Sequence, residues 1–263
     1  MKNIFLQEMK LNIKNFLIWS LTVGGLGLAC IMLYQSMQGD MKEMADAFSN
    51  MGAFSDAFGM STLSIATMKG FFATEVGTVH GLGSAMFAAI LAINILSKEE
   101  EGHSGEFLLS FPVSRSKVIT AKGLCVLFFL VLFTILCSVL YVSGFWMLEE
   151  EIPTAEFTKF MLCQFLMNIE IAAICFAISS CSGKNRMGLG IGIAMLCYFY
   201  DLIGRVVPDL KESLVAGPFS YANASEIFSG NEISSLAVLI AVIVISAAVA
   251  FTYYYYNRRD LAA

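Results

Sequence analysis

Long apolar runs alternate with short polar stretches along this chain of 263 residues. A helix needs about 20 mostly apolar residues to cross the hydrocarbon core of a bilayer. Six runs come close to that length or exceed it, at residues 16–35, 78–96, 123–147, 160–180, 187–207 and 236–256. The pattern therefore predicts an all-α membrane protein, with six transmembrane helices in a single domain that covers residues 1–263.

The composition agrees with this pattern. The chain is 57% hydrophobic and 14% charged, with a mean hydropathy of +0.73, whereas a soluble domain carries about 25% charged residues. The six runs leave no room for a large soluble domain, so we expect membrane lipids and no nucleic acid among the partners. The seven cysteines lie in or beside the apolar runs without a Cys-x-x-Cys motif, which indicates small buried side chains and neither a disulfide framework nor a metal site.

The distribution of basic residues predicts the orientation. With six spans both termini lie on one side, and that side holds 11 of the 16 Lys and Arg residues although the net charge is −5. Basic residues concentrate in the cytoplasmic loops of membrane proteins. We therefore expect a multi-pass protein of the cell membrane with both termini, and the loop at residues 98–122, in the cytoplasm.

Residues 1–15 predict an amphipathic helix. Leu6, Met9, Ile13 and Phe16 recur at helical spacing, and Lys10 and Lys14 lie between them, as in helices that lie at the membrane interface. The alternative is a secretory signal peptide, but Glu8 interrupts the basic region and no small-residue cleavage site follows. We favour an interfacial helix at the N-terminus.

The outer segment at residues 36–77 carries a further amphipathic pattern. Its apolar seam has a 4-3-4-3 spacing and consists of Met37, Met41, Met44, Phe48 and Met51. This spacing is typical of one face of a helix. Either the first helix continues outward and packs on its own neighbours, or the methionines form an adaptable outer lid or a contact with a second subunit.

Three ionisable residues stand out in or beside the fourth and fifth spans. Glu170 lies near the centre of the fourth span, where an unpaired carboxylate costs roughly 2.5 kcal/mol or more. Asp201 and Arg205 end the fifth span at an i, i+4 spacing that lets them meet on one helix face. The structural interpretation is a helix-to-helix hydrogen bond for Glu170 and a local ion pair for Asp201 with Arg205. The functional interpretation is that all three belong to a translocation path.

The loop at residues 98–122 is the longest charged stretch between two apolar runs on the predicted cytoplasmic side. Within it lies a short apolar core, residues 107–113. Pro112 disfavours a helical conformation at Phe111, and Ser114 can cap a new helix that begins near Arg115. The loop therefore predicts a stiff elbow with an apolar face for a soluble partner.

No motif of a soluble enzyme type occurs in the chain. The zinc-protease, nucleophile-elbow and phosphate-loop patterns are absent, and Gly183-Lys184 lacks both the earlier glycine and the preceding strand of a phosphate loop. We therefore expect a protein that is not an enzyme and binds no cofactor of its own. Intramembrane catalysis that depends on Glu170 or His80 is the remaining enzymatic alternative.

The elbow resembles a known family. Three glutamates at residues 99–101, then Glu106-Phe107-Leu108-Leu109-Ser110-Phe111-Pro112-Val113-Ser114-Arg115, and Lys122 at the head of the third span look like the cytoplasmic loop of the type-2 ABC transporter permeases. The number of spans, the N-terminal helix and the lack of a nucleotide-binding motif are similar as well.

The resemblance implies the membrane subunit of an ATP-driven exporter. It implies a coupling helix between the second and third spans, two separate ABC ATPase subunits that bind ATP and Mg²⁺, and a second permease, identical or related. The ATPase-docking residues would be Glu106, Phe107, Leu108, Leu109 and Phe111, with Arg115 as a charged support. The translocation path would use Glu170, Asp201 and Arg205. The alternative function is a membrane assembly or sensor protein that recruits a cytoplasmic partner without transport.

Overall fold

The structure, a computed structural model, describes residues 1–37, 45, 47, 51–58, 60, 63–102 and 113–259. Within these ranges every regular element is a helix. Six helical runs are long and apolar enough to cross a membrane, which confirms the predicted all-α membrane fold. They are α1 (Lys2–Met37), α4 with η1 and α5 (Met68–Phe71, Phe72–Val76 and Gly77–Ile93), α8 (Arg115–Met147), α9 (Thr154–Cys181), α10 (Met187–Val206) and α12 (Ser235–Arg258).

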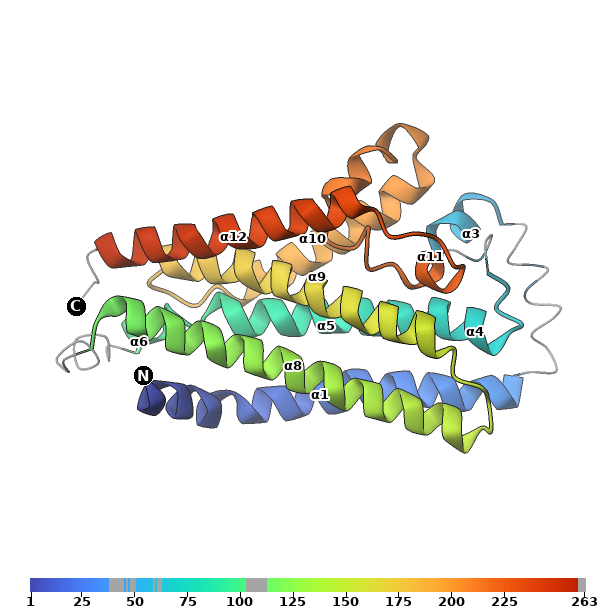
Figure 1. Ribbon diagram of the computed structural model, residues 1–263, viewed down its shortest axis with the longest axis horizontal. Coiled ribbons are helices and arrows are strands. Elements are labelled where there is room, and N and C mark those ends of the chain that lie inside the picture. Colours follow the sequence, from blue (N-terminus) through green and yellow to red (C-terminus); the bar gives the residue numbers. More distant parts are fainter. Residues whose placement is uncertain are drawn as a thin grey trace.

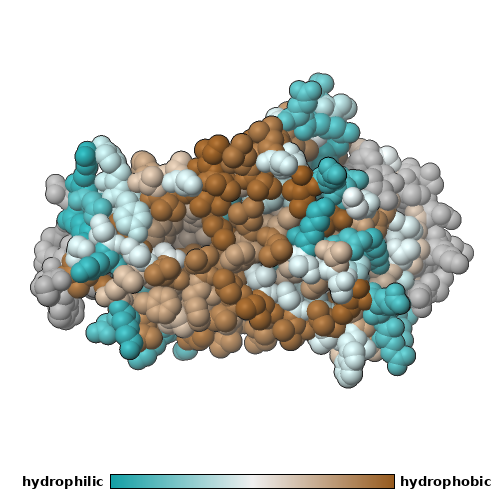
Figure 2. Space-filling model, in the orientation of Figure 1, coloured by the Kyte–Doolittle hydropathy of each residue, from teal (hydrophilic) through white to brown (hydrophobic). Residues whose placement is uncertain are grey.

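The long helices lie side by side in one bundle (Figure 1). The start of α1 and the end of α12 lie at the same end, which we call the termini end. Hydrophilic side chains gather towards both ends of the bundle and hydrophobic ones form a band between them (Figure 2). Such a band is what a protein that crosses a bilayer presents to lipid. Helices α5 and α9 are mostly buried, whereas few residues of α10 and α12 are buried.

The short elements complete the chain between the spans. They are α3 (Ala53–Phe58), α6 (Lys98–Glu101), η2 (Pro208–Leu210), η3 (Ser213–Ala216) and α11 (Ala224–Phe228). Of the apolar seam expected in residues 36–77, only Met37 and Met51 are among the described residues. Met37 ends α1 and Met51 is exposed, so both interpretations of the seam stay open.

Three helix starts differ from the expected boundaries, and the fourth span begins at Thr154, six residues before Phe160. The second span begins at Met68, ten residues before Thr78, and passes through a π-helical turn at Phe72–Val76. The apolar pattern did not reveal this start, because polar residues such as Thr74 and Glu75 interrupt it. Most residues of the π-helical turn are buried in the bundle, and this packing stabilises the turn. At the N-terminus α1 runs from Lys2 to Met37 without a break; an interfacial position of residues 1–15 stays a prediction.

Helix α8 begins at Arg115, as expected from the residues around it. Ser114 is the N-cap residue and has an extended backbone, but its side chain makes no capping hydrogen bond. The first turn is closed instead by the backbone, where the amide of Lys117 donates to the carbonyl of Ser114 at 2.9 Å. The helix start is confirmed, and the expected capping bond is not formed.

Glycines allow α1 and α8 to approach closely. A Cβ atom on Gly27 would lie 2.4 Å from Tyr141 Cε1, and one on Gly24 would lie 2.6 Å from Leu140 Cδ1. On α8, a Cβ on Gly144 would lie 2.9 Å from the Ile31 side chain. These distances are below van der Waals contact, so glycine permits this helix separation and a larger residue would require the facing side chain to move. Gly25, by contrast, faces open space.

An aromatic core fills the bundle at the end opposite the termini. Phe72 is fully buried, and its ring lies 5.3–6.1 Å from five others, those of Tyr141, Phe145, Phe157, Phe160 and Phe228. Phe228 belongs to α11, in the stretch between α10 and α12. Most side chains from residue 217 to residue 228 are buried, so this stretch folds back into the bundle.

Candidate functional site at the termini end

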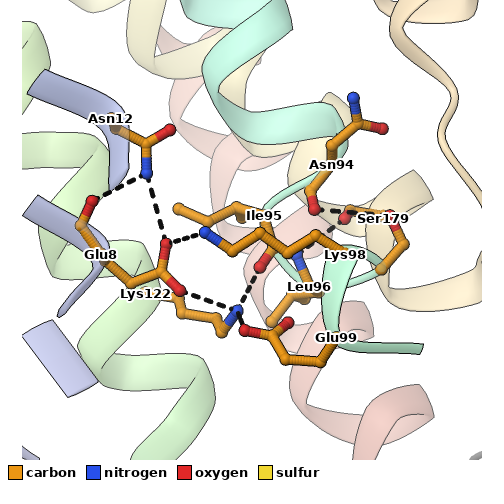
Figure 3. A network of polar contacts seen from close by, with 10 residues as sticks. Glu8, Asn12, Asn94, Ile95, Leu96, Lys98, Glu99, Lys122 and Ser179 are labelled. Atoms are coloured by element: carbon orange, nitrogen blue, oxygen red, sulfur yellow. Dashed lines mark hydrogen bonds and ion pairs between the residues drawn. The ribbon is translucent and has the colours of Figure 1, made fainter. Parts of the chain in front are cut away.

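Four charged side chains meet inside the termini end of the bundle: Glu8, Lys98, Glu99 and Lys122 (Figure 3). We call them the charge cluster. They come from α1, from α6 and from α8, so three separate segments converge on them. Two of the four, Lys98 and Glu99, lie at the start of the predicted coupling region, and Lys122 lies at its end.

Lys122 is the centre of the charge cluster. Its side chain is fully buried, and its Nζ lies 3.0 Å from Glu8 Oε1. The same ammonium donates to Glu99 Oε1 and to the carbonyl oxygen of Ile95. A buried ammonium is tolerated only when it is paired and hydrogen-bonded. Three acceptors for its three N–H bonds meet that condition.

Glu8 is the matching anion. It is 2% exposed, and its Oε2 accepts hydrogen bonds from Lys98 and from Asn12 Nδ2, the latter at 3.3 Å. Each Glu8 oxygen therefore has a cationic partner. The helix α1 thus carries one buried acid that is bound to both ends of the coupling region.

The turn between α5 and α6 is held from the other side by α9 and by the turn after it. The amide of Leu96 donates to Ser179 Oγ at 3.0 Å. Asn94 bonds to the turn before α10, donating to Asn185 Oδ1 at 3.0 Å and accepting from the amide of Arg186 at 2.8 Å. The segment that enters the coupling region is therefore fixed on both sides.

Arg115, at the start of α8, binds the end of α12. Its Nη1 donates to the carbonyl oxygens of Tyr256 at 3.2 Å and Asn257 at 3.4 Å, and to that of Arg259. A cation is favourable at a helix C-terminus, where carbonyls lack partners in the helix. Arg259 in turn donates to the carbonyls of Ser180 and Ser182 at 2.9 and 3.1 Å. Arg115 therefore links α8 to the C-terminal segment; its role as a support for a docked protein stays a prediction.

The remaining predicted docking residues, Glu106, Phe107, Leu108, Leu109 and Phe111, lie outside the described residues. The structure describes the residues on either side of them. The chain is described up to Gly102 and again from Val113. On one side of that interval lie Lys98 and Glu99, and on the other lie Arg115 and Lys122, all of them bonded to the bundle.

Glu170 has a partner within the chain. Its Oε2 accepts a hydrogen bond of 2.7 Å from the hydroxyl of Tyr221, which lies in the stretch that folds back into the bundle. Burial, followed by the nearby Glu170 carboxylate, raises the pKa of the Tyr221 phenol well above its usual value. Tyr221 is therefore a hydrogen-bond donor at any physiological pH. The structural interpretation of Glu170 was a bond between helices, and the bond found here runs from a helix to an irregular segment.

Asp201 and Arg205 form the expected ion pair. Arg205 donates through Nε to Asp201 Oδ2 at 2.8 Å and through Nη2 to Oδ1 at 3.1 Å, and it also approaches Glu226 Oε1 at 3.4 Å. Asp201 borders a small cavity of about 40 Å³ together with Gln164 and Asn223. Glu170 is not among the residues that line this cavity, so the structure does not bring the three predicted path residues into one site.

His80 is a core residue of the second span. It is 1% exposed, and its Nδ1 lies 2.9 Å from the hydroxyl of Tyr141. The rings of Phe133 and Phe160 lie within 6 Å of it. The described residues around His80 therefore hold it in an aromatic setting, and no carboxylate is bonded to it there, as an acid–base pair would require.

Sequence reasoning missed the charge cluster as a unit. Lys122 was noticed at the head of the third span and Glu8 as an interruption of a basic segment, but nothing in the sequence linked them. A signal was present, because an acid among bases on an amphipathic helix and a lysine at the head of an apolar run each need a partner when buried. Tyr221, in a stretch that was expected to be an outer loop, carried no comparable signal.

The fold and these contacts define a class of protein: a six-span helical membrane protein with a buried ionic cluster at the root of one loop. Comparison with known families makes this specific. The family model described as "ABC-2 family transporter protein" matches residues 2–261, and the chain belongs to this family. It is thus a membrane permease of the ABC transporter type, as its loop sequence predicted. A search of curated proteins found no match.

Proposed function

We propose that this chain is the membrane subunit of an ATP-driven exporter of the cell membrane, with both termini and the coupling region in the cytoplasm. Two ABC ATPase chains, which bind ATP and Mg²⁺, dock on residues 106–111 of a pair of permeases. The second permease is identical to this chain or related to it. Substrate then moves outward as the ATPases open and close.

The observation that carries this proposal is the double anchoring of the coupling region. Lys98 and Glu99 before it and Lys122 after it share one buried ionic cluster with Glu8. Ionic contacts of a fully buried lysine resist separation, because breaking one leaves an unpaired charge in a low-dielectric setting. A force applied between the two anchors is therefore passed to α1, α5 and α8 together.

The basic residues at the termini end support the orientation. Arg115, Arg258 and Arg259 all lie there, beside the aromatic side chains that end α12. Basic residues next to an aromatic belt are typical of the cytoplasmic boundary of a membrane helix. The direction of transport, export as opposed to import, is proposed from the resemblance of the loop at residues 98–122 to that of the type-2 ABC transporter permeases.

The docking step can be tested by placing charge on the apolar face. The double variant Leu108→Asp with Leu109→Asp should abolish co-purification with the partner ABC ATPase and abolish transport. The control is Ser104→Asp with Ser114→Asp, which adds the same charge to the same loop and leaves residues 106–111 unchanged. Unchanged ATPase binding in the leucine variant would refute the docking assignment, and loss of binding in both variants would show a general effect of charge.

A further inference from the structure

An apolar groove runs along the outer surface of the bundle between α8, α9 and α12. Its volume is about 340 Å³, and almost all of its lining is hydrocarbon. Helix α8 contributes the face from Thr120 to Leu130, and α12 contributes Ile245, Val249 and Tyr253. The floor belongs to α9, where Ala172 and Ala173 leave room. The face on which these three helices lie carries the hydrophobic band of Figure 2.

Polar contacts close the groove at the termini end. The hydroxyls of Thr120 and Tyr253 lie 2.7 Å apart, and one turn further Asn257 Nδ2 donates to Ser116 Oγ at 3.1 Å. These contacts join α8 to α12 above the groove. Below them, side chains of α8 and α12 line the opposite walls of the groove. The groove is therefore a hollow with a polar rim and an apolar interior.

The dimensions of the groove match one lipid leaflet. From Thr120 to Leu130 the helix rises about 15 Å, which is half of a hydrocarbon core about 30 Å thick. A groove of this length with a hydrocarbon lining suits a lipid acyl chain.

A cation lies at the rim. Lys117, Thr120, Leu124 and Leu127 recur at 3-4-3 spacing, which places them on one face of α8, and the last three line the groove. Lys117 is exposed and forms no ion pair with any residue that the structure describes. An ammonium at the polar end of an apolar groove suits a lipid phosphate.

From this geometry we infer that the groove between α8, α9 and α12 binds one phospholipid from the leaflet at the termini end, with an acyl chain along Leu124 and Leu127 and an anionic headgroup at Lys117. This site is independent of the ATPase-docking role. It lies on a face that the Glu8–Lys122 cluster does not use.

Glycine 123 offers a way to block the groove without disturbing the fold. Gly123 lines the groove, and a Cβ placed on it would meet only the ring of Phe176 at 3.7 Å, an ordinary contact. Gly123→Leu therefore projects into the groove. Val131→Phe is the control, because Val131 is exposed and borders a separate apolar hollow between α8 and α9.

The test is native mass spectrometry of the purified chain in mild detergent with phosphatidylglycerol or phosphatidylcholine of identical acyl chains. We expect one retained lipid per chain, a preference for phosphatidylglycerol, at least fivefold less retention in Gly123→Leu, and wild-type retention in Val131→Phe. Equal retention in the two variants, or no retained lipid in the wild type, would overturn the site.

A second variant tests the headgroup. Lys117→Gln should lower the preference for phosphatidylglycerol at least threefold and leave retention of phosphatidylcholine unchanged; an unchanged preference would overturn the assignment of Lys117. A photo-crosslinking side chain at Leu127 should label lipid in membranes. Labelling of a protein chain at that position, in place of lipid, would identify a partner helix and contradict the inference.

Discussion

The ammonium of Lys122 lies 3.0 Å from Glu8 Oε1, and it joins the first helix of the chain to the root of the third span. Lys122 is fully buried and Glu8 is 2% exposed, so the pair is shielded from water. With Lys98 and Glu99 beside them, the two residues form a compact ionic unit of balanced charge. This unit is the mechanical connection that we expect between the coupling region and α1.

Removing the ammonium should destabilise the protein strongly. Lys122→Met leaves Glu8 and Glu99 without their buried partner, and the loss of one member of a buried pair costs about 3–5 kcal/mol. Lys98→Met is the control, because Lys98 is partly exposed and contacts Glu8 alone within the charge cluster, and Glu8 then keeps Lys122 and Asn12; we expect a smaller loss there than for Lys122→Met. Unfolding monitored in detergent gives both values, and equal losses would contradict the central role of Lys122.

The bond between Glu170 and Tyr221 should be structural. Tyr221→Phe removes the donor to a buried carboxylate and should cost about 1.5–3 kcal/mol. Glu170→Gln keeps an acceptor oxygen for the phenol and should cost less, whereas Glu170→Leu should cost as much as Tyr221→Phe. Thermal unfolding ranks the three variants. If Glu170→Gln instead kept full stability and lost transport, the carboxylate would act on substrate.

Arg205 should stabilise the end of α10 that carries its ion pair with Asp201. Arg205→Met leaves Asp201 and Glu226 facing each other without a cation, and we expect a loss of about 3 kcal/mol. Adding Asp201→Asn removes the orphaned charge and should restore part of that stability. Transport by the double variant is expected to persist, since the pair has its partners inside the chain. Loss of transport in a stable double variant would place these residues on the translocation path.

Glycine at position 27 should be required for the contact between α1 and α8. Gly27→Ala places a Cβ 2.4 Å from the Tyr141 ring, and such overpacking costs about 1–3 kcal/mol. Gly25→Ala is the matched change on the same helix, where the Cβ meets nothing within 4 Å. There alanine should be neutral or add up to about 1 kcal/mol through helix propensity. The free energy of unfolding of the purified chain measures both changes. Equal changes in the two variants would show that the close approach of α1 and α8 does not require glycine at position 27.

The number of spans, the helical class and the family followed from the sequence. Each rests on a property that a segment carries by itself: about 20 apolar residues commit a stretch to the bilayer whatever its neighbours do, and the loop with Pro112 and Arg115 is a contiguous pattern. The start of α8 at Arg115 was predictable for the same reason. The start of the second span was not, because residues 68–77 are too polar to be recognised as a span and become helical through contacts such as those of Phe72.

The site depended on the tertiary structure. Glu8, Glu99 and Lys122 are separated widely along the chain, and each alone is an ordinary charge near a helix end. Only the packing of α1 against α8, permitted by Gly24 and Gly27, brings the acid of the first helix to the lysine of the third span. The sequence by itself determined that the chain crosses a membrane six times and carries a charged elbow. The tertiary structure decided which charges are buried together, because pairing energy depends on distance and desolvation, and neither is a property of a single segment.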